Sequence, residues 1–219
     1  MAIDFRLYLI TDRHATKKPL IEAVRLALEG GVRAIQLREK DMPVRELLAL
    51  AKDMRQLTKE FQAKLFINDR VDVAVNVDAD GVHVGHSSIP VDAVRSIVGS
   101  GMLIGASTHN KSEAITAQDD GADFVTFGPI FETPSKKKYG APVGLCELKE
   151  LKKNINIPIF GLGGIKCGNI IRVIGCGADG ISMISAILAA EDVKKAAENI
   201  LEAMRMSDKA ICECCAPRE

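Results

Sequence analysis

Three basic side chains follow short apolar runs of the sequence and could stabilise an anion. Arg38 and Lys40 come directly after one such run, and Lys136 lies in a later loop that is rich in hydroxyl groups. Guanidinium and ammonium groups bind phosphate oxygens through charge-assisted hydrogen bonds. If the fold brings the three cations together, they form a site for a phosphate or a diphosphate.

A second group of residues has the chemistry of a phosphate site. Gly163 and Gly164 follow another apolar run, and Ser185 follows the last one. Glycines let backbone N–H groups approach an anion closely, and the free N–H groups at the start of a helix favour negative charge. Alone, the two glycines would be interpreted as a tight turn. Together with Ser185 they favour a bound phosphate.

The elements that must position these residues form a regular series of eight βα units. We expect strands at 7–11, 34–38, 65–68, 81–85, 103–107, 124–128, 158–163 and 180–185. We expect helices near 19–30, 43–61, 70–77, 90–98, 111–120, 144–154, 168–175 and 191–206. The strands are mostly continuous apolar runs, which is typical of parallel strands that are covered on both faces.

This pattern predicts an α/β protein with a single (β/α)8 barrel, a TIM barrel, over residues 1–206. Residues 207–219 would form a flexible, cysteine-rich C-terminal tail. An open doubly wound sheet is the alternative fold, but its early glycine-rich dinucleotide fingerprint is absent. In a barrel the active site lies at the C-terminal ends of the strands, where the basic and glycine-rich segments described above would meet. Asp80, Asp123 and Asp179 precede strands and should instead serve stability.

The composition excludes several classes of protein. The 29 Lys and Arg residues balance 29 Asp and Glu residues, so no overall field attracts nucleic acid or an anionic membrane. No segment approaches the roughly 18 apolar residues of a membrane-spanning helix. We therefore expect a cytoplasmic protein whose partners are small molecules. Cys212, Cys214 and Cys215 lack the second pair that a zinc site requires, and reduced thiols are the simplest interpretation.

Eight short motifs, taken in order, resemble those of the thiamin phosphate synthase family. They are LYLITD, QLREK, IND, GVHVG, STHN, FGPIFETPSK, GLGGI and GADGISMISAI, and they span about residues 7–190. The resemblance implies that 4-amino-2-methyl-5-hydroxymethylpyrimidine diphosphate is joined to thiazole phosphate, with release of pyrophosphate. It also implies Mg²⁺ as the cofactor.

The resemblance further implies a role for each matching residue. The pyrimidine diphosphate would contact Gln36, Leu37, Arg38, Glu39, Lys40, Asn68, Ser107 and Lys136. The thiazole phosphate would contact Thr133, Pro134, Ser135, Gly164, Ile184 and Ser185. Arg38, Lys40, Ser107 and Lys136 would be catalytic because they stabilise the departing pyrophosphate, and Asp69 would be a magnesium ligand.

One position departs from the family pattern. The family usually carries a second magnesium-binding aspartate after the fourth strand, in a Gly-Gln-x-Asp pattern, whereas this chain has Ser88 there. Mg²⁺ often keeps several waters and binds substrate phosphate oxygens, so one carboxylate can suffice while Ser88 acts through water. We expect a weaker or altered dependence on the metal.

Two alternative functions fit parts of the sequence. A thiazole tautomerase of the same superfamily would use His109 as a general acid and base. A non-catalytic phosphate-binding barrel would be consistent with the loss of the carboxylate at position 88. The intact QLREK motif and the Asn68-Asp69 pair favour a diphosphate substrate and turnover.

Overall fold

The computed structural model describes residues 3–133 and 141–215, with residues 208–215 described by their backbone alone. Eight parallel strands form a closed barrel in chain order, and β8 pairs with β1. The strands are β1 Leu7–Ile10, β2 Ala34–Leu37, β3 Lys64–Asn68, β4 Gly81–Val84, β5 Leu103–Thr108, β6 Phe124–Phe127, β7 Ile159–Leu162 and β8 Gly180–Met183. The predicted (β/α)8 barrel is confirmed.

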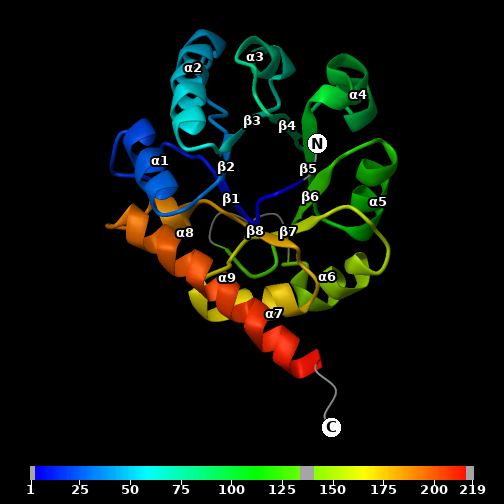
Figure 1. Ribbon diagram of the computed structural model, residues 1–219. Coiled ribbons are helices and arrows are strands. Elements are labelled where there is room, and N and C mark those ends of the chain that lie inside the picture. The colour runs from blue at the N-terminus through cyan, green and yellow to red at the C-terminus, as the bar shows by residue number, and fades with distance from the viewer. Residues whose placement is uncertain (1–2, 134–140, 216–219) are drawn as a thin grey trace.

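Helices form a ring around the strands (Figure 1). They are α1 Leu20–Glu29, α2 Val44–Glu60, α3 Val71–Asn76, α4 Val91–Val98, α5 Lys111–Asp119, α6 Gly144–Lys152, α7 Ile170–Gly175, α8 Ser185–Leu188 and α9 Val193–Cys215. Short 3-10 turns lie at Gly99–Gly101 and Cys167–Asn169. The last unit differs from expectation, because β8 is followed by the short α8 before the longer α9. The backbone of α9 continues to Cys215, and a domain boundary at residue 206 stays a prediction.

Aromatic rings fill the interior of the barrel. Tyr8, Phe66, Phe124 and Phe160 are fully or almost fully buried, and Phe5 packs beneath them at the strand entrances. Their ring centroids lie 5.2 to 6.1 Å apart, mostly in edge-to-face or tilted arrangements, which aromatic pairs prefer. These rings fill the part of the barrel interior that lies nearer the strand entrances.

Glycines on neighbouring strands make space for these rings. A Cβ atom on Gly81 would overlap the ring of Phe66, one on Gly105 would overlap Phe124, and one on Gly180 would overlap Phe160. Each of these three rings therefore lies against a glycine of the neighbouring strand, as expected where interior side chains pack in layers.

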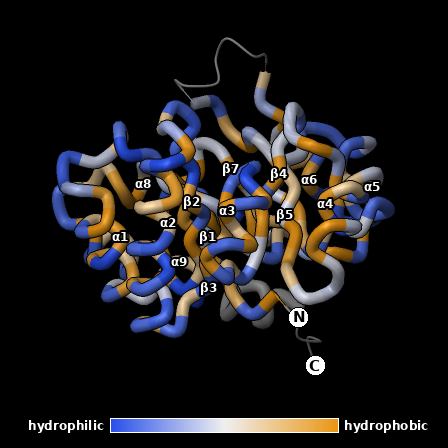
Figure 2. The backbone as a smooth tube through the Cα atoms, turned by 90° about the horizontal axis from the view of Figure 1, so that it is seen from above, coloured by the Kyte–Doolittle hydropathy of each residue, from blue (hydrophilic) through white to orange (hydrophobic). Residues whose placement is uncertain are grey.

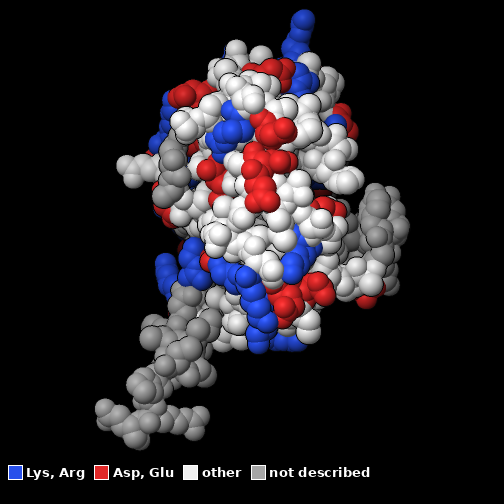
Figure 3. Space-filling model, turned by 90° about the vertical axis from the view of Figure 1, so that its right-hand side faces the viewer, with Lys and Arg blue, Asp and Glu red and all other residues white. Residues whose placement is uncertain are grey.

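A second apolar layer lies between the strands and the helices. In α1, for example, Leu20, Ala23, Val24, Ala27 and Leu28 are buried, which is the spacing of one helix face. Full burial of each large aliphatic side chain contributes about 1.5–3 kcal/mol. The hydrophilic segments lie mostly on the outside (Figure 2). Both charge signs occur on the face shown in Figure 3, in keeping with the balanced composition.

Three acids at the strand entrances serve stability, as the sequence predicts. Each accepts a hydrogen bond from the first or second N–H group of the preceding strand and from a basic side chain of a surrounding helix. The sets are Asp80 with Leu65 and Arg55, Asp123 with Ile104 and Arg95, and Asp179 with Ile159 and Lys152, at 2.6 to 2.9 Å. Among the described residues, no helix is long and apolar enough to cross a membrane.

Candidate active site

The segment after β2 is held by its middle residue, Glu39. The Glu39 carboxylate is buried and accepts hydrogen bonds from the Thr11 hydroxyl at 2.6 Å and from the Arg13 backbone N–H at 3.1 Å. The Arg13 guanidinium lies 3.2 Å from the same carboxylate. Thr11 Oγ1 in turn accepts from the Arg38 N–H at 2.9 Å. The carboxylate therefore joins the ends of β1 and β2.

The side chains of Glu39 and Leu37, both of which are predicted to contact a substrate, are already engaged within the chain. Both Glu39 oxygens have partners within the chain, and the Leu37 side chain is buried in the layer between strands and helices. Contacts of these two residues with a ligand therefore stay predictions, and they would come most directly from the backbone.

The two basic residues that flank Glu39 have no such partners. Within the described part of the chain, the side chains of Arg38 and Lys40 form no hydrogen bond or ion pair; Arg38 is half-buried and Lys40 is exposed. The Arg38 charge contributes to lowering the pKa of His83, after the larger effect of burial, so it lies close to the barrel interior. Both cations lie at the C-terminal rim of the barrel, where an anion can bind them.

The ends of β3 and β4 bring Asp69, Asn68 and Ser88 together. Asn68 Nδ2 donates to Asp69 Oδ2 at 2.7 Å, and the Ser88 hydroxyl donates to Asp69 Oδ1. Asp69 has a φ of 61°, a left-handed conformation that is uncommon for a residue with a side chain and is often found at functional sites. A groove of 660 Å³ between α3 and α4 reaches Asp69 and Ser88.

The donor set around Asp69 fits a hard cation only in part. Carboxylate, amide and hydroxyl oxygens are the ligands that Mg²⁺ accepts. However, the described residues contain no cluster of three or more His, Cys, Asp or Glu side chains that could hold a metal ion. One carboxylate with neighbouring neutral oxygens suits a cation that completes its coordination with water and substrate oxygens.

Ser107, on β5, lies at the inner wall of the barrel. Its hydroxyl is 2.9 Å from His83 Nε2 and 3.5 Å from Thr126 Oγ1. His83 is fully buried, and this burial lowers its pKa to about 3, so the imidazole is neutral at pH 7. The pKa is lowered although the negative charge of Asp69 opposes the effect. The ring is a fixed hydrogen-bonding group beneath Ser107.

Gln36, on β2, occupies the inner wall as well. Its amide Nε2 donates to the Tyr8 hydroxyl at 3.1 Å, and that hydroxyl is 3.4 Å from His83 Nδ1. Sequence reasoning singled out neither Tyr8 nor His83 as a site residue. The available signal was that His83 is the one polar side chain of the strand GVHV and shares its side of the strand with Gly81.

The loop after β6 runs along the end of β7. Ile130 N–H donates to the Leu162 carbonyl at 2.8 Å, and Phe131 N–H donates to the Gly163 carbonyl at 3.1 Å. Gly164 has a φ of 67°, and a Cβ atom there would lie 2.6 Å from the Cβ of Phe131. Only glycine permits this approach, which places Gly164 beside the segment that leads to Thr133.

The remaining predicted phosphate ligands follow β8. Ile184 is half-buried, and the exposed Ser185 begins α8. The first N–H groups of a helix have no acceptor within the helix and are available to an anion. Thr133 is half-buried at the end of the described part of its loop. Pro134, Ser135 and Lys136 lie outside the described residues, so their roles stay predictions.

His109 lies at the start of α5 and belongs to its cap. Its Nδ1 atom is 3.2 Å from Glu113 Oε2, and the same carboxylate oxygen accepts from the His109 N–H at 2.8 Å. Asn110 is the N-cap residue and accepts from the Glu113 N–H. These contacts favour a role of His109 in holding the helix end.

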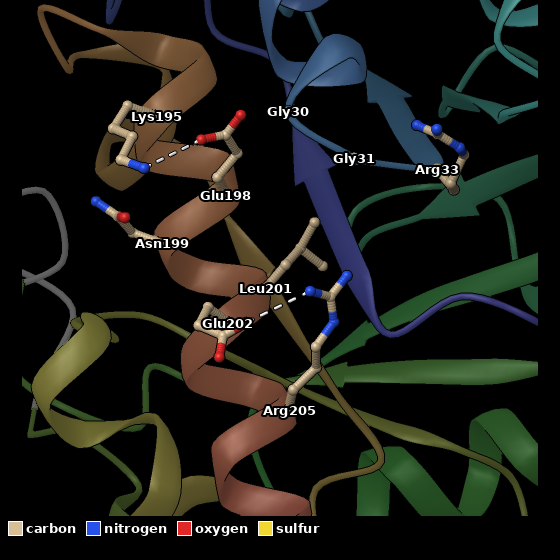
Figure 4. Close-up of a pocket in the computed structure, with 9 residues that line it drawn as sticks. All are labelled: Gly30, Gly31, Arg33, Lys195, Glu198, Asn199, Leu201, Glu202 and Arg205. Atoms are coloured by element: carbon tan, nitrogen blue, oxygen red, sulfur yellow. Dashed lines mark hydrogen bonds and ion pairs between the residues drawn. The ribbon is translucent and has the colours of Figure 1, made fainter.

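A separate cavity of 490 Å³ lies at the opposite end of the barrel, between α9 and the turn that precedes β2 (Figure 4). Its lining is charged, but Lys195 pairs with Glu198 at 3.3 Å and Arg205 pairs with Glu202 at 3.4 Å. The cavity therefore presents balanced surface pairs and lies away from the C-terminal strand ends.

Comparisons with known proteins agree with this geometry. A family model described as thiamine monophosphate synthase matches residues 7–187. A putative thiamine-phosphate synthase from Geobacter sulfurreducens is 52% identical over 200 residues, covering 91% of this chain and 94% of that protein. A thiamine-phosphate synthase from Desulfitobacterium hafniense is 43% identical over 206 residues, covering 94% of this chain and all of that protein.

A solved structure shares the architecture. The thiamine phosphate pyrophosphorylase from Pyrococcus furiosus superposes with a TM-score of 0.86 at 41% sequence identity. The superposition covers 93% of this chain and 96% of the other. The similarity in sequence and in fold therefore extends over the whole barrel.

Proposed function

Because this chain belongs to the thiamine monophosphate synthase family, we propose that it joins 4-amino-2-methyl-5-hydroxymethylpyrimidine diphosphate to thiazole phosphate. The products are thiamin phosphate and pyrophosphate, and the enzyme is a transferase. The observation that carries the proposal is that Arg38 and Lys40, on the same rim as Asp69 and Ser107, have no side-chain partner in the part of the chain that the structure describes.

Arg38 and Lys40 bind the diphosphate of the pyrimidine substrate in this proposal. Both cations lack a partner among the described residues, and an anion between them gains charge-assisted hydrogen bonds. Glu39 holds the segment by its contacts with Thr11 and Arg13, so the two cations stay in place before the substrate arrives. Lys136 would reach the same diphosphate from the loop after β6.

Asp69 is the residue that would hold Mg²⁺, with Asn68 and Ser88 contributing neutral oxygens directly or through water. The metal ion, when bound, neutralises charge on the leaving diphosphate. With a serine at position 88 instead of a second carboxylate, water and substrate oxygens would supply more of the ligands of a bound Mg²⁺.

The thiazole phosphate occupies the glycine-rich end of the site. Gly164, Ile184 and Ser185 lie after β7 and β8, where phosphate sites of (β/α)8 barrels commonly form. Thr133, Pro134 and Ser135 complete this part of the proposal. The two substrates then lie on neighbouring parts of one rim, with the reacting atoms between them.

The chemistry needs no protein nucleophile. The bond between the pyrimidine methylene carbon and the diphosphate oxygen breaks, and the electron pair leaves with the diphosphate. The electron-rich pyrimidine stabilises the resulting carbocation, and the thiazole nitrogen donates its lone pair to form the new carbon–nitrogen bond. Arg38, Lys40 and Lys136 stabilise the departing charge, Ser107 orients the reacting groups, and the rest is positioning.

The two alternatives receive no support from the relatives described above. The tautomerase would need His109 for proton transfer, but that residue is exposed and contacts Glu113. A purely binding barrel has no counterpart among those relatives, which carry the name of a synthase. We also propose that the protein acts in the cytoplasm, which agrees with its balanced charge.

The proposal is tested by Lys40→Gln, with Lys52→Gln on the exposed side of α2 as a matched control. The unmodified protein should form thiamin phosphate and pyrophosphate in equal amounts. Lys40→Gln should lower kcat/KM by about 100-fold, as is usual when one group that stabilises transition-state charge is lost. Equal activities of the two variants would contradict the role of Lys40, and no product from the unmodified protein would contradict the function.

A further inference from the structure

A chain of hydrogen bonds crosses the barrel just below the rim and connects Gln36 with Ser107. Gln36 Nε2 lies 3.1 Å from the Tyr8 hydroxyl, the Tyr8 hydroxyl lies 3.4 Å from His83 Nδ1, and His83 Nε2 lies 2.9 Å from Ser107 Oγ. Gln36, Tyr8 and His83 are at most 1% exposed. Water therefore has little access to the chain, and each proton must be matched by an acceptor within it.

The direction of the first two hydrogen bonds follows from the chemistry of the groups. The Gln36 amide nitrogen is a donor only, so the Tyr8 oxygen accepts from it. The proton of the Tyr8 hydroxyl then points to His83 Nδ1, its other described partner. Burial raises the pKa of Tyr8 well above its usual value, so the hydroxyl keeps that proton.

The direction of the third hydrogen bond follows from the second. A neutral imidazole has one donor and one acceptor nitrogen, so an accepting Nδ1 leaves the proton on Nε2. His83 Nε2–H then donates to Ser107 Oγ. An imidazolium would have two donor nitrogens and could not accept from the Tyr8 hydroxyl, which lies 3.4 Å from Nδ1.

The chain therefore fixes what its two ends can offer a ligand. Ser107 Oγ accepts from His83 and, at 3.5 Å, from the Thr126 hydroxyl, so both of its lone pairs are used and its own proton is available to donate. The Gln36 amide nitrogen is directed toward Tyr8, so its oxygen Oε1 is available to accept. Reversing this pattern would require the Gln36 amide to rotate and its hydrogen bond with Tyr8 to break.

We propose that Tyr8 and His83 are positioning residues that make the site specific for a 4-aminopyrimidine, because they present an acceptor at Gln36 and a donor at Ser107. The edge of a 4-aminopyrimidine carries an exocyclic N–H donor beside a ring-nitrogen acceptor, which complements the site. The corresponding 4-oxo pyrimidine carries an acceptor beside an N–H donor, which opposes it at both atoms. The inference rests on the proposed function and concerns how the site recognises the amino group and the ring nitrogen of the pyrimidine.

The first test needs no substrate. Nitrogen NMR of the ¹⁵N-labelled free protein at pH 7 should show His83 as the neutral tautomer with its proton on Nε2, the signals being assigned by their loss in His83→Gln. Tyr8→Phe removes the donor to Nδ1 and should give a mixture of tautomers. A proton on Nδ1, or an imidazolium, in the unmodified protein would overturn the proposal even if the enzyme is a synthase.

The second test is discrimination between substrates. The ratio of kcat/KM for the 4-amino pyrimidine diphosphate to that for its 4-oxo analogue should fall about tenfold or more in Tyr8→Phe, since a site that fixes polar groups rejects a mismatched ligand strongly. The KM for thiazole phosphate should not change, because the chain does not reach the glycine-rich end of the site.

Ser182→Ala is the matched control for the loss of a buried hydroxyl. Ser182 lies on β8 in register with Tyr8, and its hydroxyl has no hydrogen-bond partner among the described residues. In Ser182→Ala, the ratio of kcat/KM for the 4-amino substrate to that for the 4-oxo analogue should stay within about twofold of the unmodified value. Removing an unpaired hydroxyl leaves the chain of hydrogen bonds intact. An unchanged ratio in Tyr8→Phe, or an equal fall in both variants, would overturn the proposal. If the unmodified protein forms no product at all, the proposed function fails while the tautomer measurement still decides the inference.

Discussion

The Ser88 hydroxyl donates a hydrogen bond to the Asp69 carboxylate across the ends of β4 and β3. The same hydroxyl accepts from the Gly85 N–H at 2.7 Å, so the side chain is held on both sides. A carboxylate at position 88 would therefore lie directly beside Asp69. Two neighbouring carboxylates repel each other without a cation and bind one more tightly when it is present.

We predict that Ser88→Asp lowers the Mg²⁺ concentration for half-maximal activity by roughly tenfold, since another charged ligand strengthens binding of a hard cation. The same variant should melt at a lower temperature in a chelator than in Mg²⁺, by a wider margin than the unmodified protein. Ser87→Asp, which adds the same charge at the exposed neighbouring position, is the control. Equal metal dependence in all three proteins would show that position 88 does not adjoin the metal.

Glu39→Gln should raise the KM for the pyrimidine diphosphate by about five- to tenfold, because a hydrogen bond to a charged group contributes about 1.5–3 kcal/mol to holding a segment. The neutral amide accepts more weakly from Thr11 and Arg13, so the segment that carries Arg38 and Lys40 loses order. Steady-state kinetics with each substrate varied in turn would measure the change. Glu22→Gln, an exposed partner of Lys18, should leave both KM values unchanged. A change confined to the KM for thiazole phosphate would contradict the assignment.

The buried imidazole of His83 should make stability depend on pH. Its pKa is about 3 in the folded protein and about 6.5 when the chain is unfolded, so the unfolded state binds a proton first as the pH falls. The contribution of His83 to stability is complete above pH 6.5 and is lost as the pH falls from about 6.5 to about 3. The slope for one proton is about 1.4 kcal/mol per pH unit.

Urea unfolding at several pH values measures this dependence. Between pH 4 and pH 6, the unfolding free energy should fall less steeply with decreasing pH in His83→Gln than in the unmodified protein. The difference between the two slopes should correspond to about one bound proton. His14→Gln, which removes an exposed imidazole, provides the comparison. Parallel plots for the unmodified protein and His83→Gln would mean that the buried ring does not resist protonation.

Asp123→Asn should destabilise the barrel by about 1–3 kcal/mol without changing the KM of either substrate. The carboxylate accepts from Arg95 at 2.6 Å and from the Ile104 N–H at 2.7 Å, at the end of the barrel opposite the site. Asp119→Asn, an exposed acid at the end of α5, is the control. Denaturant unfolding measures the loss, and a raised KM with unchanged stability would place Asp123 in the site instead.

The barrel could be predicted from the sequence because its signals are local. Apolar runs alternate with amphipathic ones, each predicted strand lies within two residues of an observed strand at either end, and Asp80, Asp123 and Asp179 fall at the strand entrances. It could also be predicted that the polar residues after the strands lie on one rim, since all C-terminal strand ends of a closed parallel barrel meet there.

The contacts within the site could not be predicted in the same way. His83 is 75 residues from Tyr8 and 24 residues from Ser107, and its ring meets both only when the barrel closes. Glu39 likewise depends on Thr11, which is 28 residues away and directly follows the neighbouring strand β1. Side-chain alternation indicates that His83 faces inward, but the partners follow from strand register and not from the sequence around it.

The most direct test of the account is the formation of thiamin phosphate from the pyrimidine diphosphate and thiazole phosphate, measured with Mg²⁺ and with EDTA. Asp69→Asn is measured beside Asp72→Asn, whose carboxylate is exposed and pairs with Arg70. We predict product with Mg²⁺ only, retained in Asp72→Asn and reduced by about 100-fold or more in Asp69→Asn. No product from the unmodified protein with saturating Mg²⁺, or equal activity in the two variants, would contradict the account.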